Sequence, residues 1–585
     1  MLARMVLLYH ILFQITTMFF AGILPEAFLI FLKGDVFMSR KNKEKAPIKP
    51  FSSIREMLRM AVNEDGEKIA YKFKNPDGTV REVTYIEFHQ TVEALGAALT
   101  EMGFGSSHMA IVSENRYDWI VAYLTALCSA GVFVPIDRQL TAKEKLHLLT
   151  DSESEVVFFS KQYMPWFVEN KAALPNIKAF ICFDIDEDTD GIISYKRLIA
   201  DGAKLDKTAY DSLKSDENEL KMLVYTSGTT GIAKGVMLSE HNLVSGVYYG
   251  LQVSRIYDTA LSILPYHHTY ESVCDILVNI HSHATLCINA VMRELVSDMQ
   301  LYHPTNIYIV PAIAEFIYFL IMKNLKEKGK LKTFRKGVKI SRAALKIGID
   351  LRPKLFAELH NLFGGKLRKI VCGGAPIRPE MGEFFNDIGI PMTGGYGITE
   401  CSPLVSVNDE SSNDFHTAGH RLACLQWRID EPNEEGIGEI AVKGDVVMLG
   451  YYKMPEKTAE VIRGGWFFTG DYGYITPDDQ ICITGRKKNI IVLSNGKNIY
   501  PEEIENLIMN IDCVSEVVVR GLKNSKGDEH ALEAEVYLNE EKTESEVKAL
   551  ISEALAELPN YKKVTKVVIR KEPFPKTTSN KIIRG

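Results

Sequence analysis

Three short apolar runs in the middle of this 585-residue chain each lead directly into glycines. These are residues 222–225 before 226–231, residues 369–372 before Gly373 and Gly374, and residues 391–393 before Gly394 and Gly395. Such runs have the length of buried strands, and the glycines after them are typical of turns. Because ligands of open α/β sheets bind beyond the carboxyl ends of the strands, the three turns could wall one nucleotide site.

The first half of the chain alternates in the same way. Strand-like runs at 109–112, 132–136 and 155–159 are separated by the helical patterns 118–130 and 141–150. Strands that alternate with helices favour a doubly wound, mostly parallel sheet. We therefore expect an α/β fold whose large N-terminal domain is built from such sheets.

From about residue 486 the pattern changes to that of a small α+β unit. Thr543 and Glu546 have the spacing of a capping box that opens a helix. The expected helices are 501–510 and 543–558, and the expected strands are 514–520, 531–538 and 565–569. The predicted organisation is a hydrophobic N-terminal segment at 1–37, a linker at 38–50, an N-terminal domain at 51–485 and a C-terminal domain at 486–585.

The first glycine turn is the richest in hydrogen-bonding groups. It contains Thr226, Ser227, Gly228, Thr229, Thr230 and Gly231, and Lys234 follows. Glycines let a backbone approach an anion closely, hydroxyls and amides can wrap its oxygens, and a lysine adds a positive charge. The run therefore indicates a polyphosphate site, for ATP above all. Its spacing differs from that of a Walker P-loop, and a merely polar hairpin is the competing interpretation.

Bulk composition narrows the class of protein. The apolar content of 46% and charged content of 24% are ordinary for a globular chain, and the length calls for more than one domain. A formal net charge of −7 argues against a general nucleic-acid binder. Nine scattered cysteines form no Cys-x-x-Cys pair, which excludes the usual zinc spacings and fits a reducing compartment that also holds ATP.

The N-terminus differs from the rest of the chain. Residues 5–25 carry no charge and have the length of a marginal membrane span. Lysines and arginines follow this segment, which would keep the next domain on the cytoplasmic side of the membrane. Three interpretations stay open: an anchor on the inner face of a membrane, a buried docking helix, and a misassigned start with Met38 as the true first residue.

The stretch from Tyr225 to Gly235 resembles the signature loop of the AMP-forming adenylate ligases, which include acyl-CoA synthetases, peptide-synthetase adenylation domains and luciferase. The resemblance covers roughly residues 50–585, and six further motifs follow in the order of that family. They are 264–268, 373–376, 396–400, 466–471, 485–488 and 575–581. The pattern as a whole looks most like the long-chain fatty acid–CoA ligases.

The resemblance implies a role for many residues. Thr226, Lys234 and Thr399 would contact phosphates, Tyr396 would face the adenine and Glu400 would bind Mg²⁺. Asp471 would bind the ribose, and Arg486 would reach the same ribose or the α-phosphate. His268 would lie near the acyl carboxylate, and Lys581 would support the adenylation step. Gly394 departs from the family, where an amide side chain is common. Further nucleotide or CoA contacts are expected at Gly374, Ala375, Gly395, Gly397, Lys488 and Gly496.

The same resemblance implies a two-step reaction with ATP, Mg²⁺ and CoA. A mobile C-terminal domain would swing about a hinge at Lys488 and exchange Lys581 for the loop 494–498. Gly496 would then line the path of the CoA thiol. Without the surrounding motifs, a lone glutamate such as Glu400 or a C-terminal lysine is usually just solvated.

The acid is less well specified. Tyr270 stands where amino-acid-activating relatives keep an aspartate, which disfavours an α-amino acid, although a one-residue shift would reopen that possibility. Residues 306–322 are apolar and aromatic, and Pro311 favours a strand followed by a helix over a membrane span. Between 323 and 346 there are ten basic residues and one acidic residue, Glu327. This cluster is either a solvated helical face or a surface for anionic lipid.

We therefore expect a fatty acid–CoA ligase that forms acyl-AMP, with medium- to long-chain acids as substrates. The alternatives are an acyl-AMP ligase that loads a carrier protein, a binding protein that holds ATP or acyl-AMP without turnover, and a hydrolytic NTPase. The missing Walker spacing opposes the last of these.

Overall fold

The computed structural model describes residues 47–226, 233–409, 413–494, 497–523, 529–576 and 582–584. Several predicted features lie outside these ranges: the N-terminal segment, Lys581, Gly496, and the loop residues Ser227, Gly228, Thr229, Thr230 and Gly231. The described chain divides into two compact units. The first runs to residue 415 and includes 422–425 and 444–458, and the second holds 416–421, 426–443 and everything from 459 onward.

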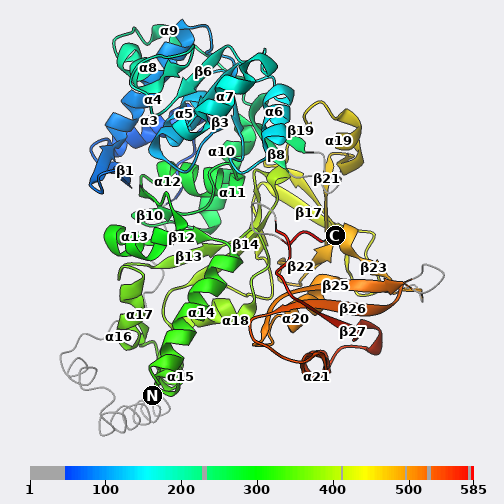
Figure 1. Cartoon of the computed structure of the whole chain (residues 1–585). Helices are drawn as coiled ribbons and strands as arrows, with labels where there is room; N and C mark the ends of the chain where they lie inside the picture. Colours follow the sequence, from blue (N-terminus) through cyan, green and yellow to red (C-terminus); the bar gives the residue numbers. More distant parts are fainter. Residues whose placement is uncertain are drawn as a thin grey trace. The chain divides into compact units, whose positions relative to one another are not determined.

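One large sheet of the first unit contains the strands predicted from the first half of the sequence (Figure 1). Its order is β19-β9-β8-β4-β3-β5-β6-β7. The strands are β3 His108–Val112, β4 Val132–Pro135, β5 Val156–Phe159, β6 Ala179–Cys182, β7 Ile193–Ser194, β8 Leu220–Thr226, β9 Lys234–Ser239 and β19 Gly450–Tyr451. Neighbours from β8 to β7 are parallel, whereas β9 runs antiparallel to both β8 and β19.

The second large sheet of this unit has the order β15-β14-β13-β12-β10-β11-β1-β2. The strands are β1 Ile69–Lys74, β2 Val80–Thr84, β10 Thr259–Ser262, β11 Thr285–Ile288, β12 Asn306–Ile309, β13 Lys369–Cys372, β14 Met392–Gly397 and β15 Leu404–Val407. All neighbours from β14 to β1 are parallel. The two sheets confirm the predicted α/β class with doubly wound, mostly parallel sheets.

Helices connect these strands and cover the sheets. They are α3 Ile54–Asp65, α4 Tyr85–Glu101, α5 Tyr117–Cys128, α6 Ala142–Asp151, α7 Met164–Asn170, α8 Tyr195–Gly202, α9 Thr208–Asp211, α10 Glu240–Val253, α11 Thr269–Glu271, α12 Val278–His281, α13 Leu295–Tyr302, α14 Pro311–Glu327, α15 Leu331–Leu345, α16 Arg352–Leu355, α17 Ala357–Leu362 and α18 Pro379–Asp387. The predicted strand followed by a helix at 306–322 is confirmed as β12 and α14. Among the described residues, no helix is both long and apolar enough to cross a membrane.

The second unit contains the small α+β structure expected near the C-terminus. Strands β25 Val514–Lys523, β26 Glu529–Leu538 and β27 Val564–Arg570 form one sheet, packed by α20 Pro501–Ile508 and α21 Glu544–Ala554. The capping box is confirmed, because the Thr543 and Glu546 side chains each accept a hydrogen bond from the other's backbone N–H. A further sheet of β17 Leu425–Asp430, β18 Gly438–Gly444, β20 Ile462–Arg463, β21 Trp466–Ile475 and β22 Ile481–Arg486 belongs mainly to this unit. The domain boundary at residue 486 stays a prediction.

One predicted turn is wrong. Gly394 and Gly395 continue strand β14, which runs to Gly397 and pairs with the antiparallel β15. A Cβ atom on Gly397 would lie 2.4 Å from the Pro403 carbonyl oxygen, and one on Gly395 would lie 3.1 Å from that of Ser406. These glycines therefore permit a close approach of neighbouring backbone, a need that the sequence alone does not distinguish from a turn.

Candidate functional site

The glycine-rich loop joins two antiparallel strands of the first unit. Thr226 at the end of β8 is paired with Lys234 at the start of β9, and the Thr226 hydroxyl lies 3.5 Å from the Lys234 carbonyl oxygen. Both side chains are partly exposed. A Thr hydroxyl and a Lys ammonium are thus held at the base of the loop, as a phosphate-binding role requires.

Tyr451 connects this loop to the predicted metal ligand, and the sequence analysis did not identify it. It lies on β19, opposite Val236 of β9. The Lys234 ammonium is 4.7 Å from the centroid of the Tyr451 ring, within reach of a cation–π contact. The Tyr451 hydroxyl donates a 2.8 Å hydrogen bond to Oε1 of Glu400. Burial and the Glu400 carboxylate raise the pKa of Tyr451, which keeps its hydroxyl protonated as a donor.

Glu400 itself is firmly placed. It lies in the short turn η5, Thr399–Cys401, just after β14, and its backbone carbonyl accepts a 2.8 Å hydrogen bond from Met448 N–H. The residue is 9% exposed. Among the described residues, no cluster of three or more His, Cys, Asp or Glu side chains could hold a metal ion. One oriented carboxylate nevertheless fits Mg²⁺ carried by a nucleotide, since such ions use one or two carboxylates together with phosphate oxygens.

The second glycine turn lies beside Tyr270. Gly374 has a φ of +83°, a conformation that favours glycine, and both Gly374 and Ala375 are exposed. A Cβ on Gly373 would lie 3.1 Å from the Tyr270 ring. The Tyr270 hydroxyl donates to the Val371 carbonyl at 3.1 Å, at the carboxyl end of β13. The side chain that the sequence analysis assigned to the α-amino position is thus a phenol whose hydroxyl is bound to backbone.

Gly394 has an unexpected neighbour. A Cβ added there would lie 3.4 Å from the side-chain nitrogen of Asn408, which is 1% exposed. The Asn408 N–H also donates to the Gly394 carbonyl at 2.8 Å. A side-chain amide is therefore present beside the position where relatives carry one, but it comes from the segment after β15. The adjacent Tyr396 and Thr399 are half-buried.

The two histidines differ in their surroundings. His268 precedes helix α11, and its ring centroid is 4.2 Å from that of His267. His267 Nε2 lies 3.5 Å from Oδ2 of Asp137, and burial lowers the pKa of His267. His268 therefore remains the candidate for the acyl side.

The second unit holds the predicted ribose-binding pair. Asp471 on β21 is opposite Arg486 on β22, and Arg486 Nε lies 2.7 Å from Oδ1 of Asp471. The Lys487 ammonium lies 2.6 Å from Oε2 of Glu439. Lys488, in contrast, forms no ion pair with a described side chain. Partial burial, followed by repulsion from Arg486, lowers the pKa of Lys488. An acid and a guanidinium are thus held together, and the guanidinium belongs to the residue two positions before the expected hinge.

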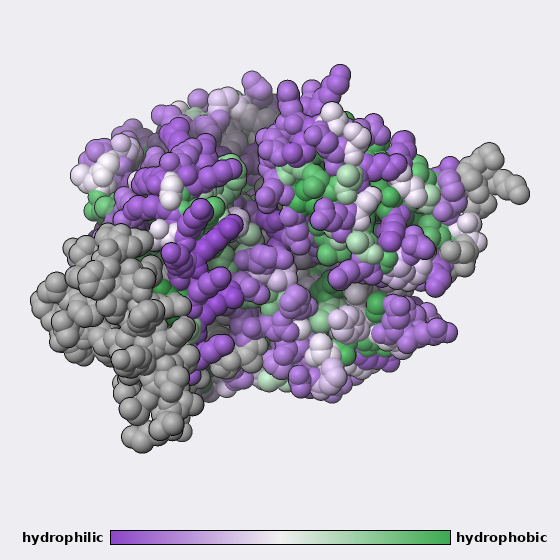
Figure 2. Space-filling model, turned by 90° about the horizontal axis from the view of Figure 1, so that it is seen from below, coloured by the Kyte–Doolittle hydropathy of each residue, from purple (hydrophilic) through white to green (hydrophobic). Residues whose placement is uncertain are grey.

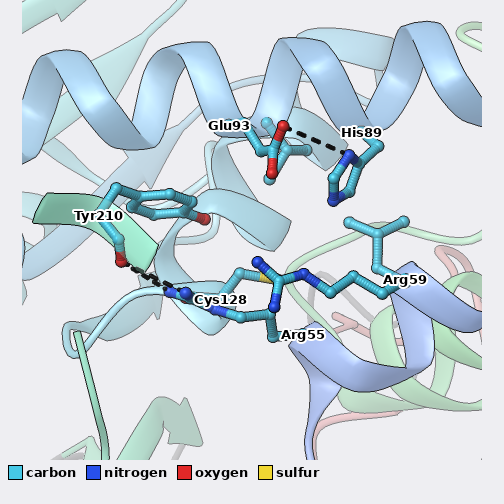
Figure 3. A pocket seen from close by; sticks show the side chains of 8 residues that line it. Arg55, Arg59, His89, Glu93, Cys128 and Tyr210 are labelled. Carbon is cyan, nitrogen blue, oxygen red and sulfur yellow. Dashed lines mark hydrogen bonds and ion pairs between the residues drawn. The ribbon is translucent and has the colours of Figure 1, made fainter. Parts of the chain in front are cut away.

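A pocket elsewhere in the first unit involves none of the predicted residues (Figure 3). Arg55 of α3 donates a 2.9 Å hydrogen bond through Nε to the Cys128 carbonyl, and its guanidinium lies 4.6 Å from the Tyr210 ring centroid. Arg59 pairs with Asp211 at 2.8 Å. Because these guanidiniums are already engaged by carbonyl and carboxylate oxygens, the pocket is best explained as a junction between α3, α5 and α9.

Comparisons with known proteins agree with this arrangement. The sequence matches the AMP-binding enzyme family over residues 58–452 and the C-terminal domain of AMP-binding enzymes over 488–585. The long-chain-fatty-acid–CoA ligase FadD15 of Mycobacterium bovis is 29% identical over 468 residues, which are 76% of each chain.

Two solved structures share the fold. The anthranilate CoA ligase AuaEII with anthranoyl-AMP has a TM-score of 0.74 at 18% identity and covers 91% of this chain and 96% of its own. The adenylation–carrier didomain of the carboxylic acid reductase from Segniliparus rugosus, with AMP, has a TM-score of 0.74 at 19% identity over 92% and 80% of the two chains.

Proposed function

This chain belongs to the AMP-binding enzyme family, and on that premise we propose that it is an ATP-dependent fatty acid–CoA ligase. The observation that carries the proposal is the set Lys234, Tyr451 and Glu400 at the base of the glycine-rich loop. In this set the Tyr451 ring contacts the Lys234 ammonium and the Tyr451 hydroxyl binds the Glu400 carboxylate, which supports a cation for phosphate oxygens and a carboxylate for a metal ion in one place.

The proposed reaction has two steps. A carboxylate oxygen of the acid attacks the α-phosphorus of ATP, the bond to the bridging oxygen breaks, and pyrophosphate leaves acyl-AMP behind. The CoA thiol, once deprotonated, then attacks the acyl carbon and AMP leaves. Because anions must meet in the first step, positioning and charge stabilisation supply most of the catalysis.

The described residues support distinct parts of the first step. Thr226 and Lys234 would hold the β- and γ-phosphates, Tyr396 would face the adenine, and Asp471 with Arg486 would bind the ribose. His268 would lie near the acyl carboxylate. Lys581 is proposed to support adenylation from outside the described residues.

Mg²⁺ is part of the proposal and would be held by Glu400. When bound, the ion neutralises charge on the phosphate oxygens. The chain's contribution is orientation, because the Tyr451 hydroxyl fixes one carboxylate oxygen of Glu400 and leaves the other for the ion.

The acid is proposed to be a medium- to long-chain fatty acid. The named relative from Mycobacterium bovis is a long-chain-fatty-acid–CoA ligase, and this likeness spans 76% of both chains. Tyr270 supports the exclusion of α-amino acids, because its buried hydroxyl is committed to the Val371 carbonyl.

A carrier protein is the second candidate acceptor. It is favoured by the likeness in fold to a didomain in which an adenylation domain is followed by a carrier domain. Activity with a phosphopantetheinylated carrier and none with free CoA would select it.

We propose a cytoplasmic location, since the proposed enzyme needs ATP and its nine cysteines form no disulfide bond with one another in the described structure. Anchoring to the inner face of a membrane by residues 5–25 remains a proposal.

The deciding experiment is ATP–pyrophosphate exchange with purified protein, Mg²⁺ and a panel of saturated acids of increasing chain length. We expect exchange that requires the acid and rises with chain length, followed by thioester release when CoA is added. Glu400→Gln should abolish exchange while the fold is retained. A folded protein that shows no exchange with any acid, or that releases orthophosphate instead, would contradict the proposal.

A further inference from the structure

Helix α14 presents large apolar side chains to solvent. Its inner face, with Ala314, Ile317 and Ile321, is buried in the core of the first unit. Its outer face bears Phe316, Phe319 and Leu320, which are 59%, 55% and 41% exposed. The spacing i, i+3, i+4 puts these three on one stripe. Among the described residues, Phe316 and Phe319 are the only phenylalanines that are exposed to this degree.

The stripe continues into basic residues. The C-terminal half of α14, the connection after it, α15 and the following residue Lys346 contain ten lysines and arginines, and all of them are exposed. The inner face of α15, with Gly337, Ile340, Ser341 and Ala344, is buried, so its lysines gather on the opposite face. The two helices contact each other and lie at the lower end of the first unit in Figure 1. Figure 2, which looks from below, shows hydrophilic side chains crowding this side.

Most of these charges have no ionic partner among the described residues. Lys330 pairs with Glu358 at 3.1 Å, and Arg342 pairs with Asp387 at 2.6 Å. The other eight form no ion pair with any described side chain, and they are Lys323, Lys326, Lys328, Lys332, Arg335, Lys336, Lys339 and Lys346. A chain with a formal net charge of −7 thus concentrates unpaired positive charge next to exposed aromatic rings.

We propose that the outer faces of α14 and α15 dock on an anionic lipid surface. Phe316, Phe319 and Leu320 would enter the interfacial region, and the eight unpaired basic side chains would meet the headgroups. This combination of an apolar stripe and a cationic face on surface helices is that of interfacial membrane-binding helices. An acidic protein would satisfy the charges but would not account for three apolar side chains on the same face.

The inference rests on surface chemistry and holds whether or not the proposed reaction is correct. The test is cosedimentation of the full chain with phosphatidylcholine vesicles, with and without about one third phosphatidylserine, a composition whose surface potential attracts polybasic segments. One variant carries Phe316→Ala, Phe319→Ala and Leu320→Ala. A second carries Lys323→Gln, Lys326→Gln, Lys332→Gln and Lys336→Gln.

A matched control removes the same charge from exposed lysines elsewhere in the first unit. It carries Lys143→Gln, Lys161→Gln, Lys204→Gln and Lys214→Gln. We expect both patch variants to lose at least tenfold in partition to the anionic vesicles, while the control binds like the wild type. Raising the salt concentration should weaken wild-type binding, because exposed charges are screened.

Circular dichroism and acyl-AMP formation from a soluble short acid show that the variants are folded, since the substituted residues lie outside the proposed catalytic site. Equal binding of the wild type to neutral and anionic vesicles would overturn the inference. Patch variants that bind as well as the wild type would also overturn it, and this result is expected if residues 5–25 or another surface carried the attachment. A wild-type protein that binds no vesicles at all would overturn it too.

Discussion

A single phenol lies between the two charges that matter most in the proposed site. The Tyr451 ring contacts the Lys234 ammonium, and its hydroxyl donates a hydrogen bond to Glu400. Since we propose that Lys234 binds the nucleotide and Glu400 its ion, we interpret Tyr451 as a positioning residue for both side chains.

Tyr451→Phe tests this interpretation, because it keeps the ring beside Lys234 and removes the donor to Glu400. A hydrogen bond to a charged group contributes about 1.5–3 kcal/mol, so we expect acid-dependent ATP–pyrophosphate exchange to fall roughly 10- to 100-fold. The loss should shrink when Mg²⁺ is raised. Tyr452→Phe is the matched control, since the Tyr452 hydroxyl binds the exposed Glu153 at 2.7 Å. Equal activity of the two variants would refute a special role for Tyr451.

Sequence motifs identified Lys234, Glu400, Asp471 and Arg486 but could not identify Tyr451. Its neighbours are apolar or aromatic, and nothing in a Gly-Tyr-Tyr run indicates a contact with residues 51 positions earlier. The ion pair between Asp471 and Arg486 could not be predicted from the sequence either, because it depends on the register between β21 and β22. The type of a residue indicates which groups it can bind, whereas the side chain that it contacts in the fold is decided by how the strands pair.

At the scale of elements, the helical segment after His268 contains two buried acidic side chains. Glu271 of α11 and Asp275 of the π-helical turn η3, Ser272–Leu277, are both 0% exposed. The side-chain amide of Asn279 donates to Asp275 Oδ1 at 2.5 Å. Burial and then the Asp275 charge raise the pKa of Glu271, and burial raises the pKa of Asp275 to about 7. Burial, and to a smaller extent the charges of these acids, raises the pKa values of the buried phenols of Tyr71, Tyr266 and Tyr308.

These shifts make stability depend on pH. In the unfolded chain both acids ionise near pH 4, whereas the folded state retains the protons to higher pH. The folded state therefore binds more protons in that interval. The contribution of these two groups to stability is fully present below about pH 4 and is lost as pH rises through the folded pKa values. The decline for one such group is up to about 1.4 kcal/mol per pH unit.

Glu271→Gln should remove much of this decline, because an amide has no proton to lose. We expect the thermal midpoint of the variant to rise relative to wild type as pH increases from 5 to 8, measured by scanning fluorimetry of the full chain. Glu101→Gln, at an exposed position, should leave the pH profile unchanged. A constant difference between the Glu271 variant and wild type across this range would show that Glu271 is ionised in the folded state.

Elements were predictable where periodicity was strong. The strands at 109–112 and 155–159 and the helix at 118–130 appear within a few residues of their expected limits as β3, β5 and α5. The allocation of strands was not predictable, since β8 enters one sheet while β13 and β14 enter another. Hydrophobic patterns indicate which face of a strand is buried but carry no information on its lateral neighbours.

At the scale of the whole molecule, the second compact unit includes strands that precede residue 486. Segments 416–421 and 426–443 belong to it, because β18 pairs with β21 far along the chain. A local change of pattern near 486 could not reveal pairings of that range. The position of the hinge at Lys488 therefore stays a prediction that only the reaction itself can test.

Gly496→Leu addresses the two-step scheme that this hinge would serve. If Gly496 lines the thiol's path only in the second half-reaction, a leucine there should leave acid-dependent ATP–pyrophosphate exchange within about twofold of wild type, a change worth only a few tenths of a kcal/mol. Thioester output should fall at least a hundredfold, and acyl-AMP should accumulate in single-turnover quenches. Ser494→Leu introduces the same side chain at an exposed position in the same loop and should retain both activities. If exchange and thioester output fell together in the Gly496 variant alone, adenylation would depend on the same arrangement of the loop, and a separate thioester-forming state would not be needed to explain the chemistry.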